Sequence, residues 1–126
     1  MTASNTGDNA GAFTVYDNIV SGFDYSYQEL GVALTEVAVW WPADNTYYEN
    51  GGGVYLRQGD RWDSDVVIHE YGHYLAYQYS FLQGDTGSPN HTWGQDLREY
   101  YTDRTDEQAA NLAFREAFAT MFAIAA

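Results

Sequence analysis

The chain has 126 residues and a formal net charge of −13 at pH 7, with five arginines and no lysine. This length suits one domain with a single hydrophobic core, and this charge argues against nucleic acid or an anionic membrane surface as a partner. Because there is no cysteine, disulfides and thiolate metal sites are excluded. Aromatic residues make up 17% of the chain, so we expect it to fold, as a monomer.

The N-terminal third predicts a lead segment followed by a helix. Residues 1–11 are small and polar, and we expect a flexible lead without signal-peptide character, so that the signal or propeptide region of a secreted protein lies outside this chain. Apolar residues then recur at three- and four-residue steps from Ala12 to Leu30, which predicts an amphipathic helix that Gly31 ends and that covers a sheet.

Three strands are predicted next. Val32–Trp41 alternates and is rich in branched and aromatic residues, which predicts a strand stopped by Pro42. Thr46–Asn50 predicts a short edge strand, and Val54–Arg57 predicts a third strand. The intervening glycines 51–53 lack a following Lys-Ser/Thr and a helix start, so they indicate a turn and not a phosphate site.

A helix predicted over 65–82 contains the pattern His-Glu-x-x-His. His69 and His73 are one turn apart, so both imidazoles lie on one face and can bind the same ion. Glu70 lies beside them and can hold its carboxylate next to a water molecule. Two neutral imidazoles, an open position and an adjacent base are what a zinc hydrolase requires. The alternative is a core helix with two incidental histidines, a pattern expected by chance in roughly one of a few hundred chains.

The same helix carries two further local signals. Asp63 or Ser64 is a credible N-cap, and Asp65 is favourable in the first turn. Apolar residues continue through Leu75, Tyr79 and Leu82, which predicts that the helix extends to Leu82. Glycine at position 72 costs helix stability, so we expect it to permit close approach of a neighbouring strand or helix.

The third ligand has two candidates. The segment 106–126 is a strong helix former, and Glu116 shares its face with small or apolar residues at 109, 112, 113, 119, 120 and 123. A lone carboxylate on such a face indicates a cation opposite it, the alternative being a buried ion pair with Arg98 or Arg104. His91, in the polar loop 83–105, is the other candidate; it could instead be a surface residue or an oxyanion donor.

His69-Glu70-x-x-His73 followed by Glu116, 43 positions after His73, resembles the gluzincin class of zinc metallopeptidases. Around these residues the chain resembles a poorly characterised bacterial group with HEyGH and EGxAt helices, over roughly 65–126. The resemblance implies that His69, His73 and Glu116 bind Zn²⁺ and that Glu70 is the general base.

The resemblance also implies a fold. It is an α+β, zincin-like fold over 12–126: a helix and a small mixed sheet over 12–62, the two ligand helices at 65–82 and 106–126, and the loop 83–105 between them. In that class the edge strand pairs with an extended peptide substrate, a role that falls here on Tyr47–Gly52 or its neighbour.

Two departures from the pattern concern the last helix. Ala117 stands where the bacterial group usually has glycine, and Thr120 stands where thermolysin has aspartate. The second departure leaves the hydrogen-bond partner of one ligating histidine unassigned.

The expected function is that of a zinc endopeptidase acting on peptide or protein substrates, with Glu70 as base and His91 as a possible oxyanion donor. The alternative is a zinc-binding domain or fragment without turnover.

Overall fold

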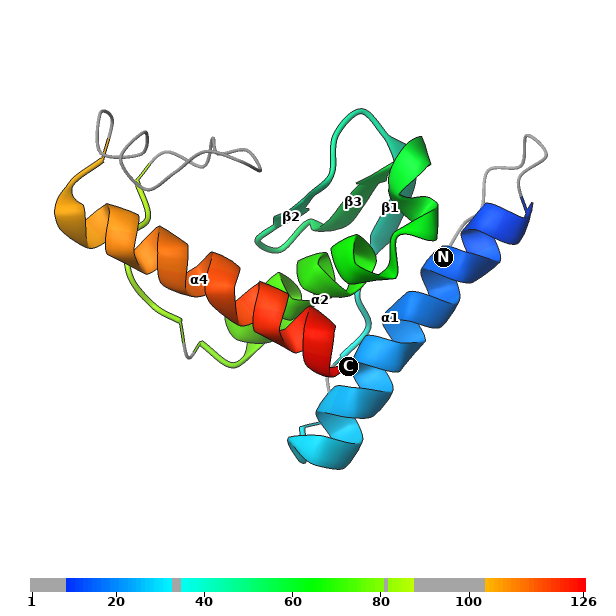
Figure 1. Cartoon of the computed structure of the whole chain (residues 1–126), viewed down its shortest axis with the longest axis horizontal. Coiled ribbons are helices and arrows are strands. Elements are labelled where there is room, and N and C mark those ends of the chain that lie inside the picture. Colours follow the sequence, from blue (N-terminus) through cyan, green and yellow to red (C-terminus); the bar gives the residue numbers. More distant parts are fainter. Residues whose placement is uncertain (1–8, 33–34, 81, 88–103) are drawn as a thin grey trace.

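The computed structural model describes residues 9–32, 35–80, 82–87 and 104–126. In chain order the elements are α1 (Asn9–Glu29), β1 (Val39–Ala43), β2 (Tyr47–Glu49), β3 (Gly53–Arg57), the 3-10 helix η1 (Gln58–Trp62), α2 (Ser64–Gln78) and α4 (Asp106–Ala125) (Figure 1). The chain is therefore of the α+β class, as predicted. None of the helices in these ranges has the length and apolar content that crossing a bilayer requires.

The sheet is small and mixed, with strand order β1-β3-β2. β1 runs parallel to β3, and β2 runs antiparallel to it, which confirms the predicted short edge strand. Between β2 and β3, Gly51 has a φ of +78°, so the predicted glycine turn is also confirmed.

The first strand differs from its prediction at both ends. It begins at Val39, not Val32, because its partner β3 spans only Gly53–Arg57 and pairs with it from Val39 to Ala43. It also runs through Pro42, where we expected it to stop. Proline is tolerated because β1 lies at the edge of the sheet, where a strand residue need not donate to a neighbour.

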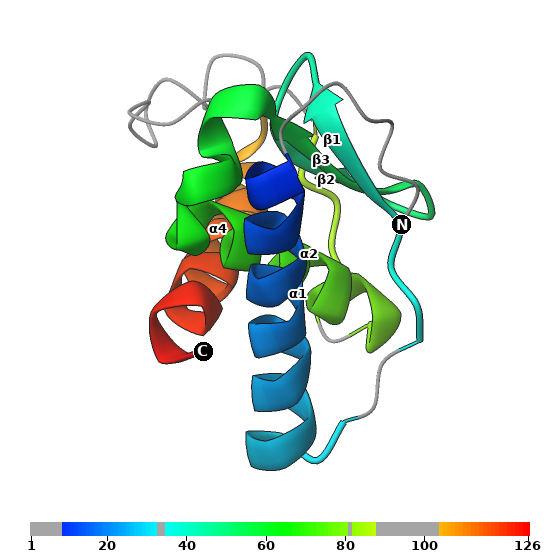
Figure 2. The same cartoon turned by 90° about the vertical axis from the view of Figure 1, so that its right-hand side faces the viewer.

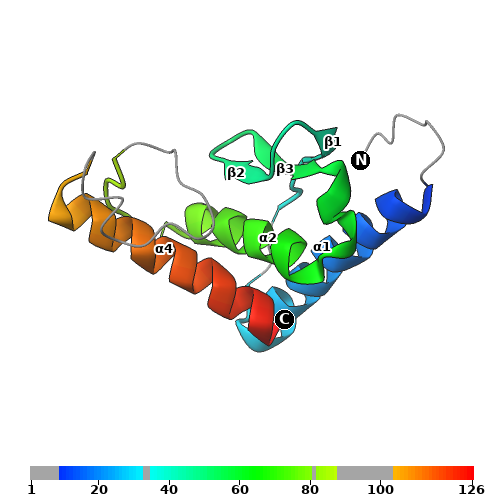
Figure 3. The ribbon, with the colours of Figure 1, turned by 45° about the horizontal axis from the view of Figure 1, so that its top comes forward.

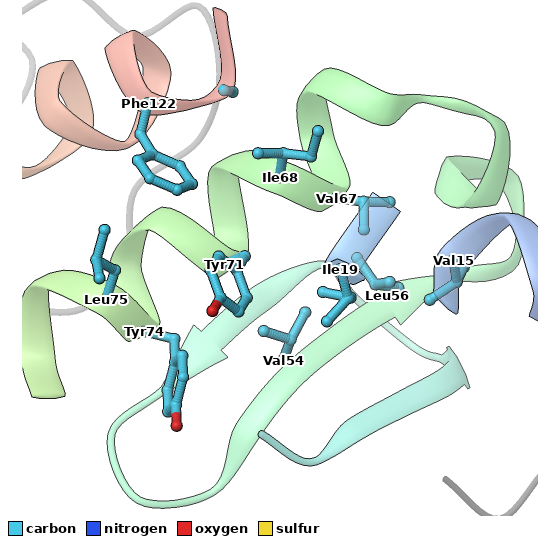
Figure 4. Close-up of a cluster of buried hydrophobic side chains, with 11 residues drawn as sticks. Val15, Ile19, Val54, Leu56, Val67, Ile68, Tyr71, Tyr74, Leu75 and Phe122 are labelled. Atoms are coloured by element: carbon cyan, nitrogen blue, oxygen red, sulfur yellow. The ribbon is translucent and has the colours of Figure 1, made fainter. Parts of the chain in front are cut away.

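The three long helices lie on one side of the sheet, with α2 nearest to it and α1 and α4 diverging beneath it (Figures 2 and 3). Val54 and Leu56 of β3 point to this side and are fully buried. They share a cluster with Val15 and Ile19 of α1 and with several apolar residues of α2 (Figure 4). The predicted first helix is thus confirmed, and it contributes to the core beneath the sheet. It begins at Asn9, so residues 9–11 belong to the helix and not to the expected flexible lead, and Gly11 is buried.

α2 is the central element of the fold. Most of its residues from Val67 to Ala76 are buried, because the helix contacts the sheet, α1 and α4 on different sides. It ends at Gln78, four residues before the predicted end. Ser80 adopts a left-handed conformation with a φ of 52°, and Tyr79 is 42% exposed, so neither continues the buried stripe.

Candidate metal centre

α2 presents both histidines of the pattern on one face. Its start is defined by Asp63, whose carboxylate accepts a hydrogen bond from the backbone nitrogen of Val66 at 3.3 Å, so the predicted N-cap is confirmed. His69 is 3% exposed, and the side chain of His73 is 17% exposed. The pair therefore lies at the margin of the core, with His69 inside it and His73 nearer to solvent.

α4 packs closely enough on α2 to bring a carboxylate to these imidazoles. A Cβ atom on Gly72 would lie 3.1 Å from the Cα of Ala119, which confirms that this glycine permits the close approach of a neighbouring helix. Ala109, Leu112, Ala119 and Ala123 of α4 are buried, as expected for the face that carries Glu116.

Contacts on its other side hold α4 in place. Arg115 donates from Nη2 to the carbonyl oxygen of Gly84 at 2.7 Å, so its charge is used away from the histidines. At the start of the helix, Thr105 and Gln108 form a capping box. The described residues that flank α4 therefore fix both its start and its rotation.

The three predicted ligands meet at one point. His69 Nε2 lies 3.1 Å from Glu116 Oε2 and 3.1 Å from His73 Nε2, and His73 Nε2 lies 3.3 Å from Glu116 Oε1. Ligand atoms held about 2.0 Å from an ion at tetrahedral angles are about 3.3 Å apart. The observed separations are close to that value, with Glu116 facing His69 through Oε2 and His73 through Oε1, so two nitrogens and one carboxylate are placed to bind a common ion.

The chemistry of these atoms also fits a cation. The two imidazole rings are nearly perpendicular, at 86°, and each directs its Nε2 toward the other ring and toward the Glu116 carboxylate. A proton placed on one nitrogen satisfies one of these contacts, whereas an ion bound by lone pairs satisfies all three together. No other group of three or more His, Cys, Asp or Glu side chains with this spacing occurs within the described ranges.

The sequence offered a buried ion pair of Glu116 with Arg98 or Arg104 as the alternative to a metal site. Arg104 donates from Nε to the carbonyl oxygen of Thr86 at 2.8 Å, and Arg98 lies outside the described residues. Both carboxylate oxygens of Glu116 face imidazole nitrogens, Oε2 that of His69 and Oε1 that of His73.

Glu70, the predicted base, is 7% exposed. It follows His69 directly on α2, so it leaves the helix about 100° around the axis from that ligand. A carboxylate this well buried is sensitive to charge in its surroundings, because little water screens it.

A residue that sequence reasoning did not assign also reaches the site. Thr120 Oγ1 lies 3.3 Å from Nδ1 of His69, on the side of the ring opposite to Glu116. The sequence placed Thr120 on the Glu116 face and noted it as a departure from aspartate, but the contact depends on how α4 docks on α2.

The edge strand is joined to the histidine helix by aromatic contacts. The ring of Tyr48, in β2, lies 6.1 Å from each of the rings of Tyr74 and Tyr77 in α2. Burial raises the pKa of Tyr48 to about 12, so this phenol remains neutral at physiological pH. The contacts place β2 beside the half of α2 that carries His73.

His91, the other expected site residue, lies outside the described residues, as does most of the loop 83–105. Comparisons with protein-family models, with curated proteins and with solved structures found no match to this chain. Any functional assignment therefore depends on the chain's own residues.

Proposed function

We propose that this chain is a zinc-dependent endopeptidase of the gluzincin type, with a zincin-like fold. The observation that carries the proposal is the convergence of three side chains: His69 Nε2 lies 3.1 Å from His73 Nε2 and 3.1 Å from Oε2 of Glu116, and His73 Nε2 lies 3.3 Å from the other carboxylate oxygen, Oε1. The predicted pattern supplied these residue types, and their positions on α2 and α4 are those that a common ion would require.

The number of ligands favours catalysis over a structural role. The cluster found among the described residues has three members, whereas a structural zinc site usually has four protein ligands. Two neutral imidazoles and one carboxylate reduce the charge of a divalent ion from +2 to +1. The remaining positive charge is available to substrate and water.

A bound zinc ion would supply two effects at this position, lowering the pKa of water toward about 7 and polarising a peptide carbonyl. Glu70 accepts a proton from the attacking water and then passes it to the departing amine. Burial of Glu70 suits this shuttle, since both proton transfers occur where bulk water competes little. His91 remains the expected donor to the developing oxyanion.

The substrate proposed is an extended peptide. β2 lies at the edge of the sheet, so a peptide can add to it as a further strand through main-chain hydrogen bonds. Its Tyr48 contacts α2 one turn beyond His73, through Tyr77, which supports binding along β2 beside the zinc ligands. Together with this function we propose that the protein is secreted and monomeric.

The test combines zinc analysis with peptide cleavage. We expect about one zinc per chain after dialysis, and cleavage of a fluorogenic peptide that a chelator abolishes and added zinc restores. Glu70→Gln should retain zinc and lose about 10²- to 10⁴-fold in cleavage rate. The exposed Glu29→Gln on α1 is the matched control and should keep both.

Two outcomes would contradict the proposal. Cleavage at the original rate by Glu70→Gln would exclude Glu70 as the base. Stoichiometric zinc without cleavage of any peptide in a random library would instead support the alternative, a zinc-binding domain without turnover.

A further inference from the structure

We infer that Thr120 is the positioning residue that accepts the Nδ1 proton of His69 in the tautomer able to bind the metal. The inference extends the proposed function and rests on its ligand set. It assigns a role to a neutral hydroxyl, which holds the ring without bringing a second carboxylate close to Glu116.

The two nitrogens of His69 have different neighbours. Nε2 faces His73 Nε2 and Glu116 Oε2, both at 3.1 Å, whereas Nδ1 faces Thr120 Oγ1 at 3.3 Å. The side chain of His69 is only 4% exposed. Water therefore has little access to either nitrogen, and the protein groups determine where the ring proton resides.

A cation at Nε2 requires a lone pair there. Neutral imidazole carries a single ring proton, so that proton must be on Nδ1, where it can be donated to Thr120 Oγ1. If the hydroxyl is removed, a buried N–H loses its acceptor, and the ring gains by moving the proton to Nε2, where it can be donated to Glu116 Oε2. That tautomer blocks the metal position.

The position of Thr120 on α4 connects this effect to helix docking. It lies one turn after Glu116 and next to Ala119, the residue that approaches Gly72 of α2. One helix thus supplies both a ligand to the ion and the acceptor that prepares another ligand. Both arrive together when α4 packs on α2.

The experiment compares Thr120→Val, which keeps the shape and removes the hydroxyl, with Thr120→Ser, which keeps the hydroxyl. Zinc affinity is measured by competition with a chromophoric chelator at fixed pH. The tautomer of His69 is read from long-range ¹H–¹⁵N correlations in the metal-free and zinc-loaded full chain. Outer hydrogen-bond partners of metal ligands usually contribute 10- to 100-fold in affinity.

We expect Thr120→Val to bind zinc about 10- to 100-fold more weakly and to shift metal-free His69 toward the Nε2–H tautomer. Thr120→Ser should stay within about threefold of the parent chain in zinc affinity and keep the parent's tautomer of His69, since a hydroxyl hydrogen bond of similar strength is retained. Unchanged affinity and tautomer in Thr120→Val would overturn the inference, and so would a serine variant as weak as the valine variant.

The parent chain alone also provides a test, which can be carried out even if Thr120→Val does not fold. His69 with its proton on Nε2 in the zinc-loaded parent would overturn the inference, and the Nδ1–H form would support it. Failure of the proposed function has a different signature, because a chain that binds zinc without cleaving peptides still reports the tautomer of His69.

Discussion

Replacing Gly72 with alanine would test how closely α2 and α4 must approach for the three ligand atoms to meet. The new Cβ would lie 3.1 Å from Cα and 3.4 Å from Cβ of Ala119. The nearer atom belongs to the backbone of α4, so a side-chain rotation cannot relieve the contact. α4 must instead move away by a few tenths of an ångström.

Two opposing effects determine how much Gly72→Ala changes the free energy of unfolding. Alanine is favoured over glycine inside a helix by about 1 kcal/mol. Inserting a methyl group into a packed contact costs about 1–3 kcal/mol. We expect the second effect to be larger here because a whole helix must shift, giving a net loss of about 1 kcal/mol in the free energy of unfolding. Zinc affinity should fall as well, since the shift separates Glu116 from the histidines.

Urea denaturation of the metal-free chain measures the change in the free energy of unfolding, and chelator competition measures the change in zinc affinity. Gly59→Ala is the matched control, because a Cβ atom at Gly59, in η1, has no atom within 4 Å. It should leave both quantities unchanged or increase stability slightly. A Gly72→Ala chain that is about 1 kcal/mol more stable than the parent, with unchanged zinc affinity, would refute a tight contact between α2 and α4.

Three further predictions concern the capping of α2, acid stability and the ligand set. Asp63→Ala should lower the free energy of unfolding by about 1 kcal/mol in urea denaturation, because Asp63 accepts the hydrogen bond from Val66 that caps α2; an unchanged midpoint would contradict this. Hydrogen bonds from the backbone of Gly87 and the side chain of Gln108 lower the pKa of Asp85. Its contribution to stability is therefore complete above its unfolded pKa of about 4 and is lost as the pH falls through the lower folded value. Asp85→Asn should flatten the pH dependence of the urea midpoint in that range, and an identical profile would be the contrary result. His73→Ala should reduce zinc affinity by more than the roughly 100-fold typical of outer partners, because it removes a ligand; retention of stoichiometric zinc after dialysis against a weak chelator would count against the ligand set.

Features of the site that depend on local geometry were predictable. The spacing of His69 and His73 fixes both imidazoles on one face of any α-helix, whatever packs around it. Predicting Glu116 as the third ligand required only the further observation that a carboxylate interrupts a helix face of small residues. A close approach of a neighbouring strand or helix at Gly72 followed from the cost of glycine in a helix, although which element approaches did not.

Features that depend on which strand or helix an element packs against were not predictable from the sequence. The alternation of Val32–Trp41 is real, but β3 is long enough to pair only with its last part, and the described residues before Val39, at 32 and 35–38, form no strand. The apolar residues after Leu75 continued the helical pattern past Ser80, whose left-handed backbone ends α2. The role of Thr120 depends on the docking of two helices, which no single-segment pattern contains.

The separation of the ligands along the chain has a consequence for a nicked molecule. His69 and Glu116 are 47 positions apart, and the chain between α2 and α4 contributes none of the three ligands. Scission of one peptide bond there would give an N-terminal fragment with two of the proposed ligands, His69 and His73, and a C-terminal fragment with the third, Glu116. Under the proposed ligand set, neither fragment alone would hold the ion well, and zinc would favour their reassociation into a complemented molecule.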